Sequence, residues 1–176
     1  MNYTNHYRSP LGDILLTADD EGLTGLHFTD DGKGVEDETS DTREKSNLPV
    51  FQETARWLDL YFSGKNPGFT PPLHLTATPF QRRVWDILLE IPYGQNVTYG
   101  EIARRMEAEA GSGRVSARAV GGAAGKNPVL LIIPCHRVIG RGGRLTGYAG
   151  GLWRKERLLA LEKRNLSVRE GTAFKT

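Results

Sequence analysis

The spacing of apolar residues changes along the chain, and this change constrains the fold more than any other feature of the sequence. Apolar and polar residues alternate over residues 2–8, 12–17 and 22–28, and turn-forming residues separate these segments. Such alternation is typical of strands with one buried face, and short turns join antiparallel neighbours. Further along, apolar residues recur at helical spacing instead. The pattern predicts an α/β protein of the α+β type that begins with a small antiparallel sheet.

The N-terminal half contains one predicted helix. Residues 51–62 follow helical spacing and end at a Ser-Gly pair, so we expect a helix that covers the sheet. Its expected apolar stripe consists of Phe51, Ala55, Leu58 and Phe62. The acidic segment 30–49 before it has the composition of a mobile loop. The proline-rich stretch 67–72 is interpreted as a linker, which predicts an N-terminal α/β domain of residues 1–77.

Residues 78–176 are predicted to form a second, mainly helical domain. Two capping-box patterns, at residues 78–81 and 98–101, mark helix starts. Helices are predicted over residues 79–91, 98–106, 116–124 and 152–164. The third is made almost wholly of small residues and follows the second after a Gly-containing connection, as in a helix-turn-helix. Because that connection, residues 107–115, is longer than usual, two ordinary packed helices remain an alternative.

Charge is divided unevenly between the two halves. Residues 1–78 carry 6 Lys and Arg against 13 Asp and Glu, a net charge of −7. Residues 79–176 carry 17 against 8, a net charge of +9. A basic half of this kind favours a polyanionic partner such as nucleic acid, with a solvated basic surface as the alternative.

The only cysteine, Cys135, stands directly before His136, after an apolar, strand-like run and a proline. A thiol beside an imidazole suggests a positioned nucleophile, although free cysteines are most often small buried hydrophobic residues. Glu162 lies on the same expected helix face as Lys155 and Leu158, where a carboxylate needs a partner. Cys135, His136 and Glu162 therefore form a possible relay, with a turn or a water between thiol and imidazole, because neighbouring side chains of a strand point to opposite faces.

Several classes of protein and site are disfavoured. The four histidines, His6, His27, His74 and His136, lack the paired spacing of a zinc site, so no metal is expected, and nothing indicates an organic cofactor. No apolar run approaches the roughly 20 residues of a membrane-spanning helix. The N-terminus lacks the features of a signal peptide. These observations favour a cytoplasmic protein with no membrane partner.

Four motifs occur together in the second half. They are residues 118–123 (RAVGGA), 127–128 (NP), 134–138 (PCHRV) and 147–151 (GYAGG). With this ordered set the chain resembles the O6-alkylguanine-DNA alkyltransferase family, the methylated-DNA-protein-cysteine methyltransferases. The agreement extends from about residue 78 to residue 162, and the N-terminal half resembles the small α/β domain of that family.

The resemblance implies direct repair of double-stranded DNA. An O6-alkylated guanine is flipped from the duplex, and its alkyl group moves to Cys135 in a single-turnover, suicidal reaction; activity on O4-alkylthymine is left open. The resemblance makes His136 a water-mediated base and Glu162 the residue that polarises it. Tyr99 aids flipping and donates a hydrogen bond or proton to guanine N3. Asn127 bridges the recognition helix and the active-site loop.

The resemblance also implies DNA-binding and substrate-binding residues. Arg118 enters the base stack in place of the flipped nucleotide. The recognition helix lies in the minor groove, and its DNA-binding residues are Ser116, Ala117, Ala119 and Gly121. The wall of the pocket that receives the base is formed by Val138, Tyr148 and Ala149.

The sequence leaves three other functions open. One is a non-catalytic alkyltransferase-like protein, although such proteins carry another residue in place of the cysteine. The second is a helix-turn-helix regulator with a sensing cysteine, and the third is a cysteine hydrolase that uses Cys135, His136 and Glu162. No dimerisation heptads stand out in the sequence, which weighs against the regulator. We expect a monomer in solution.

Overall fold

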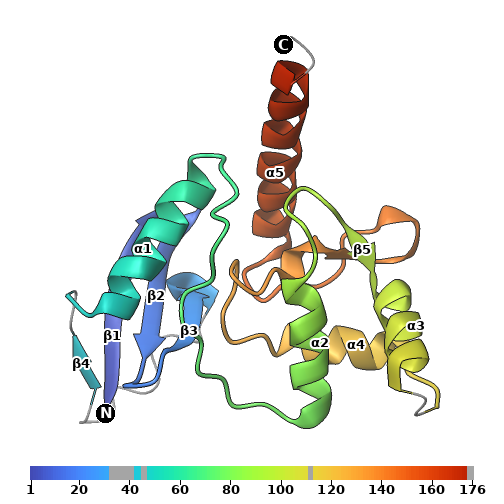
Figure 1. Cartoon of the computed structure of the whole chain (residues 1–176), viewed down its shortest axis with the longest axis horizontal. Coiled ribbons are helices and arrows are strands. Elements are labelled where there is room, and N and C mark those ends of the chain that lie inside the picture. Colours follow the sequence, from blue (N-terminus) through green and yellow to red (C-terminus); the bar gives the residue numbers. More distant parts are fainter. Residues whose placement is uncertain (32–41, 45–46, 111–112, 174–176) are drawn as a thin grey trace. The chain divides into compact units, whose positions relative to one another are not determined.

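The computed structural model describes residues 1–31, 42–44, 47–110 and 113–173 (Figure 1). The chain forms two compact units. The first consists of Met1–Thr76 with Pro128–Ile132, and the second of Ala77–Asn127 with Ile133–Thr176. The short segment Pro128–Ile132 thus packs within the first unit although it lies far along the sequence.

The first unit is built on the antiparallel sheet that the alternating pattern predicted. Its strands β1 (Asn2–Ser9), β2 (Gly12–Ala18) and β3 (Leu23–Phe28) pair in sequence order. In β2 the alternate residues Ile14 and Leu16 are fully buried, because successive side chains of a strand point to opposite faces. The three expected strands and their antiparallel pairing are confirmed.

A fourth strand lies in the segment that was predicted to be a loop. β4 (Thr42–Glu44) pairs parallel with β1, and Tyr3 stands opposite Arg43. The loop prediction was therefore wrong for these three residues, because a short polar edge strand is held by main-chain bonds and carries no apolar alternation. Residues 32–41 and 45–46 of the predicted loop lie outside the described residues.

Helix α1 (Pro49–Phe62) packs against β1 and β2, as expected (Figure 1). It begins earlier than predicted because Pro49 occupies its first turn, where a missing N–H costs nothing. The buried side chains are Phe51, Thr54, Trp57, Leu58 and Tyr61. The expected stripe is therefore corrected: Ala55 and Phe62 are only half-buried, and the large aromatic rings decide which face turns inward.

Two segments cover the outer edge of β3. The amide of Leu23 donates to the carbonyl of Pro72 at 2.8 Å, and the amide of Leu26 donates to the carbonyl of Pro128 at 2.9 Å. Part of the predicted linker is thus bonded to the sheet. These bonds satisfy an edge that would otherwise be exposed to pairing with another chain.

The second unit is mainly helical. Its helices are α2 (Pro79–Leu89), α3 (Tyr99–Ala110), α4 (Ala117–Gly125) and α5 (Leu152–Ala173). Both predicted capping boxes form: Thr78 and Gln81 exchange bonds of 3.1 Å, and Thr98 and Glu101 exchange bonds of 3.0 and 3.1 Å. These reciprocal bonds satisfy main-chain N–H groups that the first turn leaves open.

Two of the helices extend further than the sequence predicted. α3 continues past residue 106 to Ala110, so the connection to α4 is shorter than expected, and α5 continues past residue 164 to Ala173. α3 and α4 pack against each other, as a helix-turn-helix requires. A short parallel pair, β5 (Val97–Thr98) and β6 (Val138–Ile139), joins the start of α3 to the segment that follows Cys135.

Candidate active site

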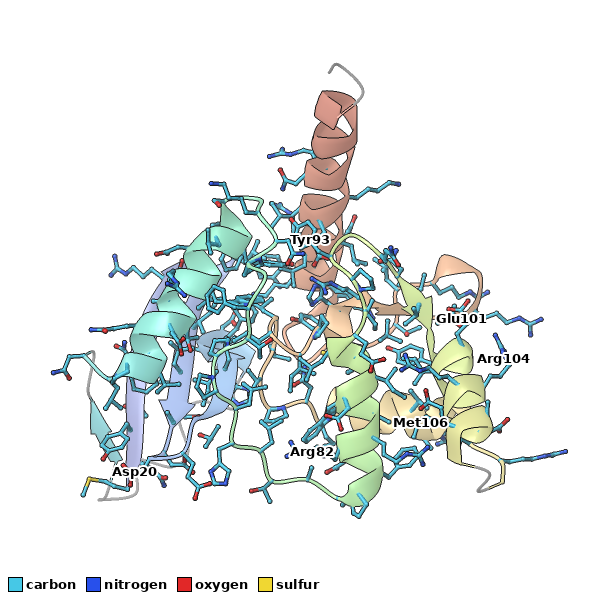
Figure 2. All side chains as sticks on the ribbon, viewed as in Figure 1. Asp20, Arg82, Tyr93, Glu101, Arg104 and Met106 are labelled. Carbon is cyan, nitrogen blue, oxygen red and sulfur yellow. The ribbon has the colours of Figure 1, made fainter. Side chains whose placement is uncertain are left out.

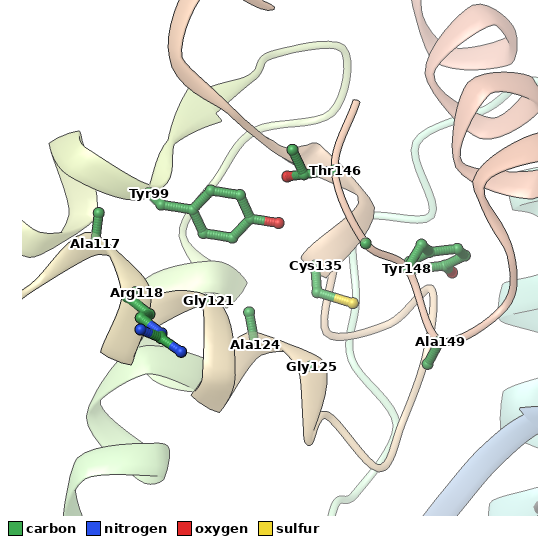
Figure 3. Close-up of a pocket in the computed structure, with 11 residues that line it drawn as sticks. Tyr99, Ala117, Arg118, Gly121, Ala124, Gly125, Cys135, Thr146, Tyr148 and Ala149 are labelled. Atoms are coloured by element: carbon green, nitrogen blue, oxygen red, sulfur yellow. The ribbon is translucent and has the colours of Figure 1, made fainter. Parts of the chain in front are cut away.

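A pocket with a volume of about 510 Å³ opens in the second unit (Figure 3). Tyr99 from the start of α3 lies on one side, and α4 contributes Arg118 and Gly121. Cys135 lies between these residues and Tyr148, and its sulfur faces the pocket. The remaining lining residues are Ala117, Ala124, Gly125, Thr146, Gly147 and Ala149. Figure 2 draws the side chains of the described residues on the ribbon of Figure 1.

Cys135 stands at the start of a tight turn and not at the end of a strand. Residues Cys135–Arg137 form one turn of 3-10 helix, and the amide of Cys135 donates to the carbonyl of Ile133 at 2.8 Å. Shortly before this turn Leu131 has φ = 70°, a left-handed conformation that is unfavourable for a residue with a side chain. The strand-like interpretation of the preceding apolar run was therefore wrong, because full burial produces the same composition without an extended backbone.

Asn127 connects the end of α4 with the cysteine turn. Its side-chain amide donates to the carbonyl of Ile133 at 2.7 Å and to Cys135 Sγ at 3.2 Å. Asn127 is buried, so both bonds are made away from bulk water, where they are strongest. Its sequence-predicted bridging position between helix and loop is the position that the structure gives it.

The surroundings of Cys135 keep its thiol protonated at rest. Burial raises the pKa of Cys135, because a thiolate is poorly solvated in the protein interior. The hydrogen bond from Asn127 and the positive charge of Lys155 act in the opposite direction and favour the thiolate. The net pKa is raised, so transfer from this sulfur needs a base that takes its proton.

A buried ionic cluster stands beside the cysteine. Glu162 Oε2 lies 2.5 Å from His136 Nε2, and Glu162 Oε1 accepts from Arg137 Nε at 2.7 Å and from the amide of Gly94 at 2.9 Å. Burial alone would raise the pKa of Glu162, but His136, Arg137 and the Gly94 amide together lower it to about 2. Glu162 is therefore an ionised carboxylate across the whole range of ordinary pH.

The ionised carboxylate fixes the proton on the His136 ring. A carboxylate only accepts hydrogen bonds, so Nε2 carries the proton that the 2.5 Å contact shares. Burial lowers the pKa of His136, although Glu162 opposes this effect, so the ring is neutral. In a neutral imidazole the other nitrogen, Nδ1, then holds a lone pair. His136 is thus prepared as a proton acceptor one residue from Cys135.

Lys155 is a site residue that the sequence analysis placed only on a helix face. Its side chain is fully buried, and Nζ donates to the carbonyl of Thr146 at 2.7 Å and lies 3.5 Å from that of Gly147. Nζ also lies 5.9 Å from the centre of the Tyr99 ring. Burial lowers the pKa of Lys155, and the neighbouring Cys135 raises it. A lysine among the apolar residues of a buried helix face was the signal that could have identified it.

On the α4 side of the pocket, Arg118 and Tyr99 make fewer polar contacts than the buried cluster of His136 and Glu162 does. Arg118 is exposed and makes no side-chain hydrogen bond or ion pair with the described residues. Tyr99 packs over Gly121, where an added Cβ would lie 3.7 Å from the ring. In Figure 3 the Tyr99 hydroxyl points toward the interior of the pocket.

The structure groups most, but not all, of the predicted DNA-binding and pocket residues. Ser116 caps α4 by accepting from the amide of Ala119 at 3.0 Å, and both residues are exposed outside the pocket lining. Tyr148 and Ala149 line the pocket, whereas Val138 is fully buried in β6, pairs with Val97 and is not among the lining residues. Thr146 and Gly147 line the pocket and were missed, because neither residue type marks a binding site by its own chemistry.

The described residues form neither a metal cluster nor a membrane-spanning helix. No group of three or more His, Cys, Asp or Glu side chains in that part of the chain is arranged to hold a metal ion. Among the described helices, none combines the length and the apolar character that crossing a bilayer requires.

Comparison with known protein families gives two matches that together cover nearly the whole chain. Residues 79–164 match the family described as 6-O-methylguanine DNA methyltransferase, DNA binding domain. Residues 2–75 match the family described as 6-O-methylguanine DNA methyltransferase, ribonuclease-like domain.

Individual proteins agree with these matches. The methylated-DNA–protein-cysteine methyltransferase of Methanosarcina acetivorans is 46% identical over 156 residues, which cover 89% of this chain and 95% of the relative. The crystal structure of the O6-methylguanine methyltransferase of Mycobacterium tuberculosis superposes with a TM-score of 0.79 at 40% identity and covers 94% of both chains. A structure of the M. tuberculosis protein in complex with DNA gives a TM-score of 0.78 at 40% identity, over 93% of this chain and 94% of that one.

Proposed function

The chain belongs to the 6-O-methylguanine DNA methyltransferase family, and from this membership and the geometry of the pocket we propose that Cys135 is the residue that accepts the alkyl group. The protein is a methylated-DNA-protein-cysteine S-methyltransferase that repairs DNA by direct reversal. The assignment of Cys135 rests on one observation: the sulfur of the only cysteine in the chain faces the pocket.

The reaction is a single displacement at the alkyl carbon. Cys135 Sγ forms a bond to this carbon while the bond from the carbon to guanine O6 breaks and leaves its electron pair on the base. The net reaction carries the thiol proton to the released guanine. A thioether has no good leaving group, so the alkylated protein is not regenerated and each molecule acts once.

In this proposal the ionic cluster supplies the base. His136 Nδ1 takes the thiol proton, directly or through a water molecule, and Glu162 stabilises the imidazolium that forms. Arg137 and the Gly94 amide hold Glu162 in place. Asn127 holds the sulfur through its 3.2 Å bond. The fixed charges stand in the site before the substrate enters, which lowers the cost of rearrangement during reaction.

Tyr99 is proposed to assist the leaving base. Its hydroxyl donates a hydrogen bond or a proton to guanine N3, where negative charge grows as the bond to O6 breaks. The direction of the hydroxyl, toward the pocket interior, supports this role. Tyr148 and Ala149 form the opposite wall, and a volume of about 510 Å³ is suited to a single alkylated base.

Duplex DNA that contains O6-alkylguanine is the proposed partner. A base inside a duplex cannot reach a buried sulfur, so it must first leave the stack. Arg118 is proposed to take its place, and the small side chains of Ala117, Ala119 and Gly121 allow α4 to approach the groove closely. Ser116 caps that helix at its DNA-facing end. The M. tuberculosis relative solved with DNA supports binding of this kind.

The proposal extends to the organisation of the protein. Residues 1–77 are assigned as a supporting N-terminal domain, and residues 78–176 as the DNA-binding and alkyl-accepting domain. We assign a monomer and a cytoplasmic location, since a reducing compartment keeps a free thiol reactive.

Intact mass after incubation with a duplex that contains one O6-methylguanine tests the proposal. We expect a gain of one methylene per protein molecule, located by peptide mapping on the Cys135 peptide. The matched variant Cys135→Ala should show no gain and still bind the lesion. Unchanged wild-type mass with lesion binding would identify a non-catalytic recognition protein, and sustained turnover of an ester or amide would identify a hydrolase. Binding of an undamaged palindromic site without transfer would identify a regulator.

A further inference from the structure

Two arginines stand exposed on the loop that leads into the pocket wall. Arg141 and Arg144 are both exposed, and neither side chain forms a hydrogen bond or an ion pair with the described residues. Between Val138 and Lys155 the sequence contains no Asp or Glu. The two guanidinium groups are therefore not neutralised by acidic neighbours along this loop.

The backbone of the loop presents these arginines on a tight turn. The amide of Gly140 donates to the carbonyl of Arg144 at 2.7 Å and closes the turn. Inside it Gly142 and Gly143 have φ of 74° and 84°, conformations that a side chain would strain. A Cβ added at either glycine would meet no atom within 4 Å. The glycines thus serve the turn geometry and not packing, and the tip stands clear of the protein.

The same loop forms part of the pocket. Thr146, which lines the pocket, is two residues after Arg144, so their Cα atoms are at most about 7 Å apart. Lys155 fixes this part of the loop through its 2.7 Å bond to the Thr146 carbonyl. Figure 3 shows Arg118 and Tyr148 on different sides of Cys135. The pocket therefore has two basic edges, one on α4 and one on the loop.

We propose that Arg141 and Arg144 bind backbone phosphates of the duplex while α4 approaches the lesion. This inference rests on the proposed function, because it places the same DNA over the same pocket. Exposed guanidinium groups that lack internal partners match phosphate in charge and in hydrogen-bond geometry. Contacts to phosphate carry no sequence information but set the position of a protein on DNA. The loop arginines would thus fix the register in which the pocket meets a flipped base.

Salt dependence of DNA binding measures these contacts directly. Each phosphate that a cation neutralises releases counterions and adds about 0.9 to the slope of log affinity against log salt concentration. The double variant Arg141→Gln, Arg144→Gln of the full chain, titrated with an undamaged duplex oligonucleotide, should lower that slope by about 1.8. Restoring the charge with Arg141→Lys, Arg144→Lys should restore the slope.

The matched control removes the same charge elsewhere in the second unit. Arg157 and Arg164 are exposed on α5, and Arg157→Gln, Arg164→Gln should leave the slope near the wild-type value. Equal slopes for the loop and control variants would overturn the inference. So would a lysine variant that behaves like the glutamine variant, because charge would then not be the cause. Far-ultraviolet circular dichroism of each variant confirms that the slopes compare folded proteins.

A separate measurement distinguishes failure of this inference from failure of the proposed function. Intact mass after incubation with a duplex that contains O6-methylguanine tests the proposed function alone. If the wild-type protein gains one methylene on Cys135 and the loop variant keeps the wild-type slope, only the inference on the loop fails. If the wild-type protein binds the damaged duplex and gains no methylene, the proposed function fails first.

Discussion

We use the name floor for Cys135, which lines the pocket, together with the buried Asn127, His136 and Glu162, and the name rim for Arg118 on α4; the floor and the rim differ in how their side chains are held. On the floor, His136 and Glu162 are almost completely buried and share a 2.5 Å contact, and Asn127 is bonded to Cys135. On the rim, Arg118 is exposed and has no internal partner among the described residues. The difference indicates that one protein can separate alkyl transfer from duplex recognition. The floor should transfer an alkyl group from any substrate that reaches it, whereas the rim should affect only the reaction with DNA.

Physical chemistry requires this difference. Buried charges are stable only when partners compensate for lost hydration, so the floor must be complete before the substrate arrives. A side chain that enters a base stack must instead be able to leave water at little cost. An arginine without internal bonds gives up only hydration and rotamer freedom when it binds DNA.

The largest expected effect comes from breaking the floor at its carboxylate. Glu162→Gln removes the group that stabilises the His136 imidazolium and leaves Arg137 buried without a charged partner. We expect alkyl transfer to slow by about 10²–10³-fold and stability to fall by about 3–5 kcal/mol. Because the floor acts without regard to DNA, single-turnover rates with free O6-benzylguanine and with a damaged duplex should fall equally.

The pH dependence of stability sharpens the same test. Because folding lowers the pKa of Glu162 from 4.5 to about 2, its contribution is fully present above about pH 4.5 and is lost as the pH falls toward 2. The shift corresponds to about 3 kcal/mol. The stability gap between the wild-type protein and Glu162→Gln, measured by urea denaturation, should narrow over that window. The control Glu156→Gln, at an exposed position of α5, should show no such gap.

The rim and the floor were not equally visible in the sequence. Cys135 and His136 are consecutive, and their chemistry marks them directly. Glu162 was found because a carboxylate stood on an apolar helix face, and the structure places it 2.5 Å from His136 Nε2. Arg137 and Gly94 were not assigned to the cluster, since contacts across such long separations in sequence follow from tertiary packing alone.

The local sequence patterns predicted the presence of strands and helices better than they predicted where these elements end. Period-two alternation located three strands, and capping boxes located the starts of α2 and α3. β4 was missed because main-chain pairing holds it. The apolar run before Cys135 was misinterpreted, because a buried turn and a buried strand have the same composition. Val138 was placed in the pocket wall by resemblance, but it is not among the residues that line the pocket.

An intermediate effect is expected at Lys155. Its charge acts on Cys135 in the floor, and its hydrogen bond holds Thr146 in the wall of the pocket. Lys155→Met removes the positive charge that favours the Cys135 thiolate and the bond to the Thr146 carbonyl. We expect the rate of transfer at neutral pH to fall about tenfold. The pH profile of the reaction with free O6-benzylguanine should also move to higher pH, because the pKa of the thiol rises further.

A second variant separates the two roles of Lys155. Lys155→Gln keeps a hydrogen-bond donor for the loop but not the charge, so its pH profile should move as that of Lys155→Met does. A Gln variant with the wild-type profile would show that Lys155 only positions the loop. The floor would then consist of Cys135, His136 and Glu162 without electrostatic help from α5.

The smallest effect, and the most selective, is expected on the rim. Arg118→Ala removes a side chain that makes no internal bond, so the free energy of unfolding should change by no more than about 0.5 kcal/mol. The rate of reaction with free O6-benzylguanine should stay within about twofold of wild type. Reaction with a damaged duplex should slow by about fivefold, because stacking of a side chain against a base contributes at least about 1 kcal/mol. Single-turnover rates with both substrates, beside the control Arg157→Ala on α5, measure the difference. Equal losses on the two substrates would place Arg118 in the floor and remove the separation between chemistry and recognition.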